Sequence, residues 1–208
     1  MEETTKQDGR NHEAVGFLTG DELFTYNGKR MVFDVKLFWR FQFSNLWDMQ
    51  GEVGEFVVSM ALGNIVPDNK NGWTQYDIDY REKRIEVKTT AYYQPWKPEG
   101  VEVSMQRTWS IRKAHEKEGD PTSPLVRNND VYVFVLIEGK NAVDANPMKL
   151  EHFKFWVIPT KLINDECGNN KSISLGKVKR LAKMRHFPEG GIGFADLRRA
   201  VDEVIDSL

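Results

Sequence analysis

The residues most suggestive of chemistry lie in one short stretch, residues 76–90, which read YDIDYREKRIEVKTT. If the REK segment turns the chain, Asp77 and Asp79 share one face of a first strand, because side chains alternate along a strand. Glu86 and Lys88 share one face of a second strand for the same reason. Pairing the two strands brings at least one aspartate beside the glutamate and the lysine.

Such a group of side chains suits metal-dependent hydrolysis. Two neighbouring carboxylates are costly unless a cation neutralises them, and oxygen ligands at a strand edge suit Mg²⁺. The backbone carbonyl of Val87, between Glu86 and Lys88, could supply a third oxygen. An ammonium group beside the metal can orient or deprotonate the attacking water and offset charge that develops on phosphorus. The stretch therefore favours phosphodiester hydrolysis.

The pattern alone has little specificity, because Asp followed by (Asp/Glu)-x-Lys occurs by chance about once per 200 residues. Two other triplets, Asp34–Lys36 and Glu138–Lys140, have the same form. The first fits the start of a helix, and Gly139 in the second indicates a turn where a core-facing residue is needed. Only Glu86–Lys88 has an apolar centre within a strand-like run.

A helix is expected before the hairpin, from about Gln50 to Leu62, with Gly63 placed to end it. Its expected apolar side carries Val53, Phe56, Val57, Met60 and Ala61. Its expected polar side carries Glu52, Glu55 and Ser59, at positions i, i+3 and i+7. A glutamate on this side can point at the hairpin and add a third carboxylate.

The other elements follow from the same periodicities. An earlier helix begins at the N-cap Asp34, with apolar residues at helical spacing: Leu37, Phe38, Phe41, Leu46 and Trp47. Residues 130–139 form an apolar run that is typical of a strand in the middle of a sheet. Residues 153–163 predict another strand that runs into a Pro-started turn or short helix.

Residues 101–106 and 108–113 could add a third strand or a strand pair. The end of the chain predicts a basic helix around Gly176–Met184 and an amphipathic helix from Ala195. One face of the last helix carries Leu197, Val201, Val204 and Leu208. Helices, then a hairpin and central strands, then helices again predict an α/β arrangement of layers.

Length and composition fit one folded domain. The 208 residues are 29% charged and 40% hydrophobic, which suffices for a sizeable core. Residues 1–12 are predicted to be a flexible tail and residues 13–208 a single domain. The lone Cys167 excludes an internal disulfide and a cysteine metal cluster, so a reducing cytosol is the expected compartment. No signal peptide or membrane span is expected, because no apolar run approaches about 20 residues.

The net charge of −2 does not indicate a strongly basic nucleic-acid binder. Basic residues nevertheless gather locally, in the hairpin, in residues 107–113 and in residues 171–186. These clusters permit contact with phosphate without showing it. The four histidines have no metal-ligand spacing.

The order of acidic helix, aspartate and Glu-x-Lys resembles the PD-(D/E)xK nuclease superfamily, which has the restriction-endonuclease-like fold. Four segments resemble, in order, a group of uncharacterised bacterial proteins of that superfamily: residues 37–63, 76–96, 128–139 and 153–164. The resemblance spans about residues 36–182, and the segment EVKTTAY is its most specific part. It implies a restriction-endonuclease-like core, with a central mixed β-sheet flanked by helices.

The resemblance also implies roles for single residues. It assigns metal binding to Asp77 and Glu86, assistance of the water to Lys88, and the role of helix acid to Glu55. Glu55 is preferred to Glu52 because it precedes Phe56 as the family's helix acid precedes an aromatic residue. Asp77 is preferred to Asp79 because YDI matches the family's form.

Two further positions complete the comparison with the family. Gln94 follows the triplet where related nucleases sometimes place a polar active-site residue, and a loop amide explains it equally well. Tyr76 replaces the proline of the superfamily's name, a position that varies widely.

The resemblance implies a cytosolic endonuclease that uses Mg²⁺, or Mn²⁺ in its place, to cut DNA in restriction, defence or repair. A homodimer is compatible with it but not required. A second hypothesis is a non-catalytic nucleic-acid-binding or assembly protein with the same fold, motivated by the acidic net charge and the lack of a recognisable DNA-reading module. A third is a protein-interaction domain. Neither the sequence nor the resemblance decides between DNA and RNA.

Overall fold

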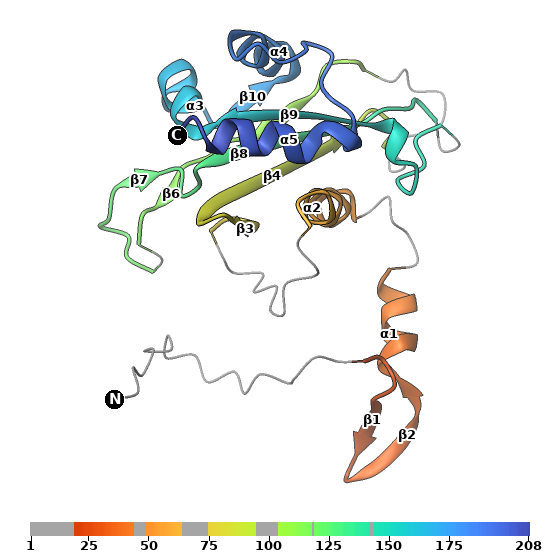
Figure 1. Ribbon diagram of the computed structural model, residues 1–208. Coiled ribbons are helices and arrows are strands. Elements are labelled where there is room, and N and C mark those ends of the chain that lie inside the picture. The colour runs from red at the N-terminus through yellow and green to blue at the C-terminus, as the bar shows by residue number, and fades with distance from the viewer. Residues whose placement is uncertain (1–18, 44–48, 64–74, 95–103, 118, 142–143) are drawn as a thin grey trace. The chain divides into compact units, whose positions relative to one another are not determined.

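The structure is a computed structural model that describes residues 19–43, 49–63, 75–94, 104–117, 119–141 and 144–208 (Figure 1). The chain forms two compact units, residues 1–45 and 46–208. The predicted tail of residues 1–12 and its boundary at residue 13 lie outside the described residues.

The first unit contains a hairpin that the sequence analysis did not predict. Strands β1 (Leu23–Tyr26) and β2 (Lys29–Asp34) pair antiparallel. The two residues between them, Asn27 and Gly28, have φ of 49° and 73°. Asn-Gly is the residue pair that favours this kind of two-residue turn, because both positions need a positive φ.

The predicted first helix is confirmed as α1 (Val35–Gln42), which follows β2 directly. The side chain of Asp34 accepts a hydrogen bond from the backbone N–H of Leu37 at 2.8 Å, as expected of an N-cap. Leu46 and Trp47, which were expected to continue the helical pattern, lie outside the described residues.

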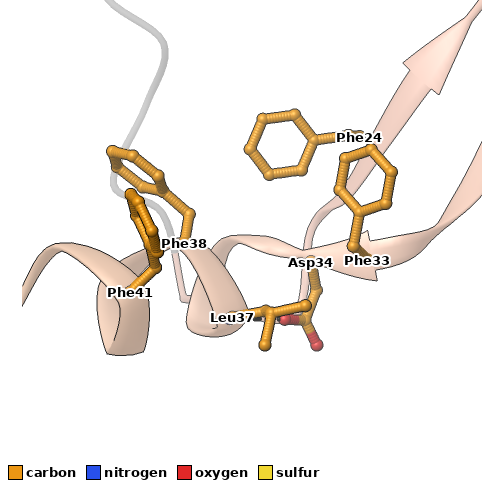
Figure 2. A pocket seen from close by; sticks show the side chains of 6 residues that line it. All are labelled: Phe24, Phe33, Asp34, Leu37, Phe38 and Phe41. Carbon is orange, nitrogen blue, oxygen red and sulfur yellow. Dashed lines mark hydrogen bonds between the residues drawn. The ribbon is translucent and has the colours of Figure 1, made fainter. Parts of the chain in front are cut away.

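Among residues 19–43 of the first unit, most large apolar side chains are exposed to solvent. Phe41 is 79% exposed, and only Val35 among the large apolar residues at 19–43 is buried. Six residues line a hollow of about 330 Å³: Phe24, Phe33, Asp34, Leu37, Phe38 and Phe41 (Figure 2). The rings of Phe24 and Phe33 are tilted towards each other with centroids 5.2 Å apart.

The second unit is built on a four-stranded mixed sheet. Its strands lie in the order β3 (Ile78–Tyr80), β4 (Lys83–Ala91), β8 (Val131–Ile137) and β9 (Phe153–Pro159). β4 and β8 are parallel, whereas β3–β4 and β8–β9 are antiparallel. Every residue of β8 is buried, which confirms the predicted central strand.

Helices cover both faces of this sheet, which confirms the predicted α/β layers (Figure 1). One face packs against α2 (Gln50–Ala61) and α5 (Phe194–Ile205). The other face packs against α3 (Thr160–Cys167) and α4 (Leu175–Met184). The predicted basic helix and the short helix after the last strand are therefore both present.

Smaller elements complete the second unit. β5 (Thr108–Ser110) pairs antiparallel with β10 (Ser172–Ser174), and β6 (Ala114–His115) pairs with β7 (Leu125–Val126). A 3₁₀ turn, η2 (Leu150–His152), precedes β9. The strand predicted within residues 108–113 exists, but it belongs to a separate two-stranded sheet. Of the segment 101–106, residues 101–103 are not described.

Two residues lie differently from their predicted faces. Phe56 was expected on the buried side of α2, but it is 54% exposed. The buried side is instead centred on Gly54, Val57 and Val58, because the glycine allows the helix to approach the sheet there. Leu208 follows the end of α5 and is 53% exposed, so it does not extend that helix's buried face.

None of the helices in the described segments has the length and apolar character that crossing a bilayer requires.

Candidate active site

The predicted catalytic hairpin is formed by β3 and β4. Ile78 lies opposite Ile85, and Tyr80 lies opposite Lys83, so the chain turns at residues 81–82. Ile78 and Ile85 are 7% and 0% exposed, and Val87 is 4% exposed. These three apolar side chains face the core as predicted, which leaves the charged side chains of the hairpin on its other face.

Asp77, rather than Asp79, lies beside the Glu-Val-Lys triplet. Oδ2 of Asp77 accepts a hydrogen bond from the backbone N–H of Val87 at 2.7 Å. Asp79 is exposed, lies opposite Arg84, and accepts a hydrogen bond from the hydroxyl of Tyr76 at 3.1 Å. The structure therefore supports the preference for Asp77 on geometric grounds.

The backbone carbonyl of Val87 lies on the same edge of β4 as this contact. The N–H and C=O of one residue in a strand point towards the same neighbouring strand. Because the N–H of Val87 points to Asp77, its carbonyl points towards the β3 side as well. The Val87 carbonyl is thus directed to the same side of β4 as Asp77, and its role as a metal ligand stays a prediction.

Glu86 and Lys88 form an ion pair within the triplet. Their side chains are 15% and 31% exposed, so the pair is largely removed from water but still reachable from it. In the parallel ladder Glu86 lies opposite Tyr132 and Lys88 opposite Phe134, so both charged side chains share that face of the sheet.

The local charges act on both members of this pair. Burial raises the pKa of Glu86 above its usual value and outweighs the opposing effect of the Lys88 ammonium; the Glu55 carboxylate adds to the rise. For Lys88, burial would lower the pKa, but attraction to Glu86, Asp77 and Glu55 outweighs burial and raises it. Lys88 is therefore held as an ammonium ion among three carboxylates.

Helix α2 brings Glu55 to this group through a close approach to β4. A Cβ atom at Gly54 would lie 1.8 Å from Oγ1 of Thr89, so only glycine fits at this contact. Glu55 follows directly and is half-buried, whereas Glu52 is exposed. Ser59, expected on the polar side of the helix, is buried at 8% exposure.

Tyr132 is a component of the site that the sequence analysis missed. It is 2% exposed and lies opposite Glu86 in the ladder. Burial, together with the nearby carboxylates of Glu86 and Asp77, raises the pKa of its hydroxyl, while Arg127 acts in the opposite direction. The sequence around Tyr132 is a continuous apolar run, so only the pairing of β4 with β8 could have identified it.

Gln94 is the last of the predicted site residues along the chain. It is half-buried and follows the end of β4 by three residues, six residues after Lys88. Its proposed role stays a prediction.

The donor set suits a small, hard cation. No three or more His, Cys, Asp or Glu side chains of the described residues are grouped so that they could hold a metal together. Mg²⁺ is, however, commonly bound by one or two carboxylates, with waters and substrate phosphates as its other ligands. Asp77 and Glu86, which flank Val87 from two strands, satisfy this smaller requirement.

Comparisons with protein-family models, with curated proteins and with solved structures found no match to this chain.

Proposed function

We propose that this protein is a Mg²⁺-dependent nuclease of the restriction-endonuclease-like fold that hydrolyses phosphodiester bonds, with DNA as the expected substrate. One observation carries the proposal. Asp77 contacts the backbone between Glu86 and Lys88, and Glu55 from α2 acts on the same two side chains. Residues from three separate elements thus converge on one edge of the sheet, in the order that the sequence resemblance implies.

Each residue has a defined task in this proposal. Asp77, Glu86 and the Val87 carbonyl would hold the metal, with Glu55 as a further acid. The bound metal would supply Lewis-acid activation of a phosphate oxygen and of water. Lys88, held as an ammonium ion, orients the attacking water and offsets negative charge on the phosphoryl group. Because Lys88 pairs with Glu86, it must release that carboxylate when a metal binds.

The second candidate is a nucleic-acid-binding or assembly protein that keeps the fold without turnover. The Lys88–Glu86 pair favours it, because an ammonium already neutralises the carboxylate that a metal would need. Calorimetry with Mg²⁺ or Mn²⁺ separates the two candidates. If the protein is a nuclease, it should bind metal, and Asp77→Asn should weaken that binding. If it is the non-catalytic protein, calorimetry should show no heat of metal binding.

Cleavage assays on DNA and RNA substrates with Mn²⁺ test the proposal directly. Lys88→Ala and Asp77→Asn should each lower cleavage by about 10²-fold or more, the usual contribution of a positioned acid–base or charged group. Lys83→Ala and Asp79→Asn are matched controls, because they remove the same charges from the same hairpin away from the triplet. Equal cleavage by all four variants, or no cleavage by the wild-type protein, would contradict the proposal.

A further inference from the structure

Helix α4 has the most one-sided charge of the helices that the structure describes. Its ten residues include four cations and no acid: Lys177, Lys179, Arg180 and Lys183. Helix α5, on the opposite face of the sheet, carries two arginines and three acidic residues. The excess of positive charge is therefore a property of α4 itself.

The apolar side of α4 is already used in packing. Leu175, Val178, Leu181 and Ala182 are buried in the same cluster as Phe134 and Trp156. Of the cations, Arg180 and Lys183 are exposed, whereas Lys177 and Lys179 are half-buried. A helix that binds a lipid surface inserts its apolar side between the lipids, and α4 has no free apolar side to insert.

Two of the four cations form no ion pair with a described residue, although the Lys179 ammonium also helps to lower the pKa of the Glu189 carboxyl. Lys177 and Lys183 each pair with a glutamate outside the helix. Lys179 and Arg180 form no ion pair with any described residue. On α5, in contrast, Arg199 contacts two acids of its own helix, at 2.8 and 2.9 Å. The unbalanced charge is thus concentrated at the middle of α4.

Two side chains of the candidate active site lie on the same face of the sheet as this charge, whereas Glu55 comes from α2 on the opposite face. Glu86 and Lys88 share the face of Tyr132 and Phe134, their partners in the parallel ladder. Both aromatic residues belong to the buried cluster against which α4 packs. α4 contacts β9, and β8 lies between β9 and β4, so a polyanion bound to α4 must extend across β8 to reach β4.

We propose that the outward side of α4 binds the sugar–phosphate backbone of a nucleic acid through Lys179 and Arg180. A ten-residue helix is about 15 Å long, which matches roughly four phosphates along one strand. Such contacts are independent of base sequence, which agrees with the absence of a DNA-reading module. The choice of nucleic acid as the ligand rests on the proposed nuclease function, but binding itself requires no cleavage.

The test measures binding without turnover, in the Lys88→Ala protein with EDTA. Fluorescence anisotropy would follow labelled DNA and RNA duplexes of about 30 base pairs, between roughly 50 and 200 mM salt. Lys179→Gln/Arg180→Gln should weaken binding and make the slope of log affinity against log salt shallower by about 2. Arg180→Gln alone should change the slope by about 1. Arg198→Gln is the matched control, because Arg198 is an exposed arginine on α5.

Each possible result of this experiment either supports or overturns the binding of nucleic acid by α4. A slope that the α4 variants leave unchanged, or that Arg198→Gln changes equally, would overturn the proposal. So would absence of duplex binding, or α4-dependent binding to phosphatidylcholine–phosphatidylserine vesicles in place of duplexes. α4-dependent binding by a protein that cleaves nothing would support this inference and refute the nuclease. Cleavage by a protein whose binding to duplexes does not depend on α4 would refute this inference and support the nuclease.

Discussion

Two β-hairpins of this chain turn in the same way but are stabilised differently. β1–β2 turns at Asn27–Gly28 and β3–β4 at Arg81–Glu82, and all four residues have φ between 49° and 73°. Asn-Gly suits such a turn, whereas arginine and glutamate are strained there. In the first hairpin the turn residues favour the observed backbone, and in the second other contacts must offset the strain.

The contacts of the second hairpin come from helix α5 and from the sheet. Arg81 forms ion pairs with Asp202 and Asp206 at 3.0 and 2.7 Å, and the hydroxyl of Tyr80 donates to Asp202 at 3.0 Å. β4 also pairs with β8 along its length. In the first hairpin, Val32 on β2 is fully exposed. Tertiary packing, rather than turn chemistry, therefore holds the candidate catalytic residues in place.

The largest expected effect tests this difference in packing. Ile85→Ala on β4 removes a side chain that is 0% exposed, and should lower the free energy of unfolding by about 2–5 kcal/mol. Val32→Ala on β2 is the matched change in the first hairpin, and should alter it by less than about 0.5 kcal/mol. Urea denaturation measures both. A large loss for Val32→Ala would contradict this difference between the hairpins, because it would show that the first hairpin's apolar face is covered in solution.

A smaller effect is expected where α2 meets β4. A methyl group at Gly54 collides with Thr89, so Gly54→Ala should cost about 1–3 kcal/mol and displace the helix that carries Glu55. Gly51→Ala, on the same helix with nothing within 4 Å, should be neutral or stabilise by up to about 1 kcal/mol.

The double variant Gly54→Ala/Thr89→Ala shows whether the loss of stability comes from the contact with Thr89. The hydroxyl of Thr89 is buried and has no hydrogen-bond partner among the described residues, so its removal gives space without breaking a hydrogen bond. The double variant should recover most of the lost stability in urea denaturation. Equal stability of Gly54→Ala and Gly51→Ala would mean that α2 is not held by this contact.

Much of the second unit could be predicted because its elements have clear apolar periods. The buried run of β8, the basic α4 and the helix from residue 50 all follow from side-chain spacing alone. The exposed Phe56 could not be predicted, because periodicity treats every apolar residue as equally suited to the core. The close approach at Gly54 depends on Thr89, which is distant in sequence and sets which side of α2 is buried.

The candidate site could be predicted only as far as local pairing determines it. The hairpin register brings an aspartate to Glu86 and Lys88, and this follows from the sequence. The position of Tyr132 depends on the parallel register of β4 and β8, which no short-range pattern specifies. The β1–β2 hairpin, in contrast, has the strong local signal of Asn-Gly at its turn, so this hairpin can be predicted from the sequence.

A smaller change in stability is expected at the two turns. Glu82 has φ of 60°, so Glu82→Gly should relieve strain and stabilise the protein by up to about 1 kcal/mol, while Arg81 keeps its ion pairs. Gly28→Ala should lower stability by about 1 kcal/mol, because alanine disfavours φ of 73° although nothing lies within 4 Å. Thermal unfolding measures both changes. Loss of stability in Glu82→Gly would contradict the inferred strain in the second turn.

The smallest effect concerns two glutamates whose pKa values move in opposite directions. Glu22, in the first unit, accepts hydrogen bonds from Thr19 and Gly20, which lower its pKa from 4.5 to about 2. Its stabilising contribution is therefore complete above pH 4.5 and is lost as the pH falls towards 2. Burial raises the pKa of Glu86, so folding favours its protonated form and stability declines as the pH rises through that pKa. NMR titration of the carboxyl carbons should place Glu22 below 4.5 and Glu86 above it. The reverse order would show that Lys88 outweighs burial at the candidate site.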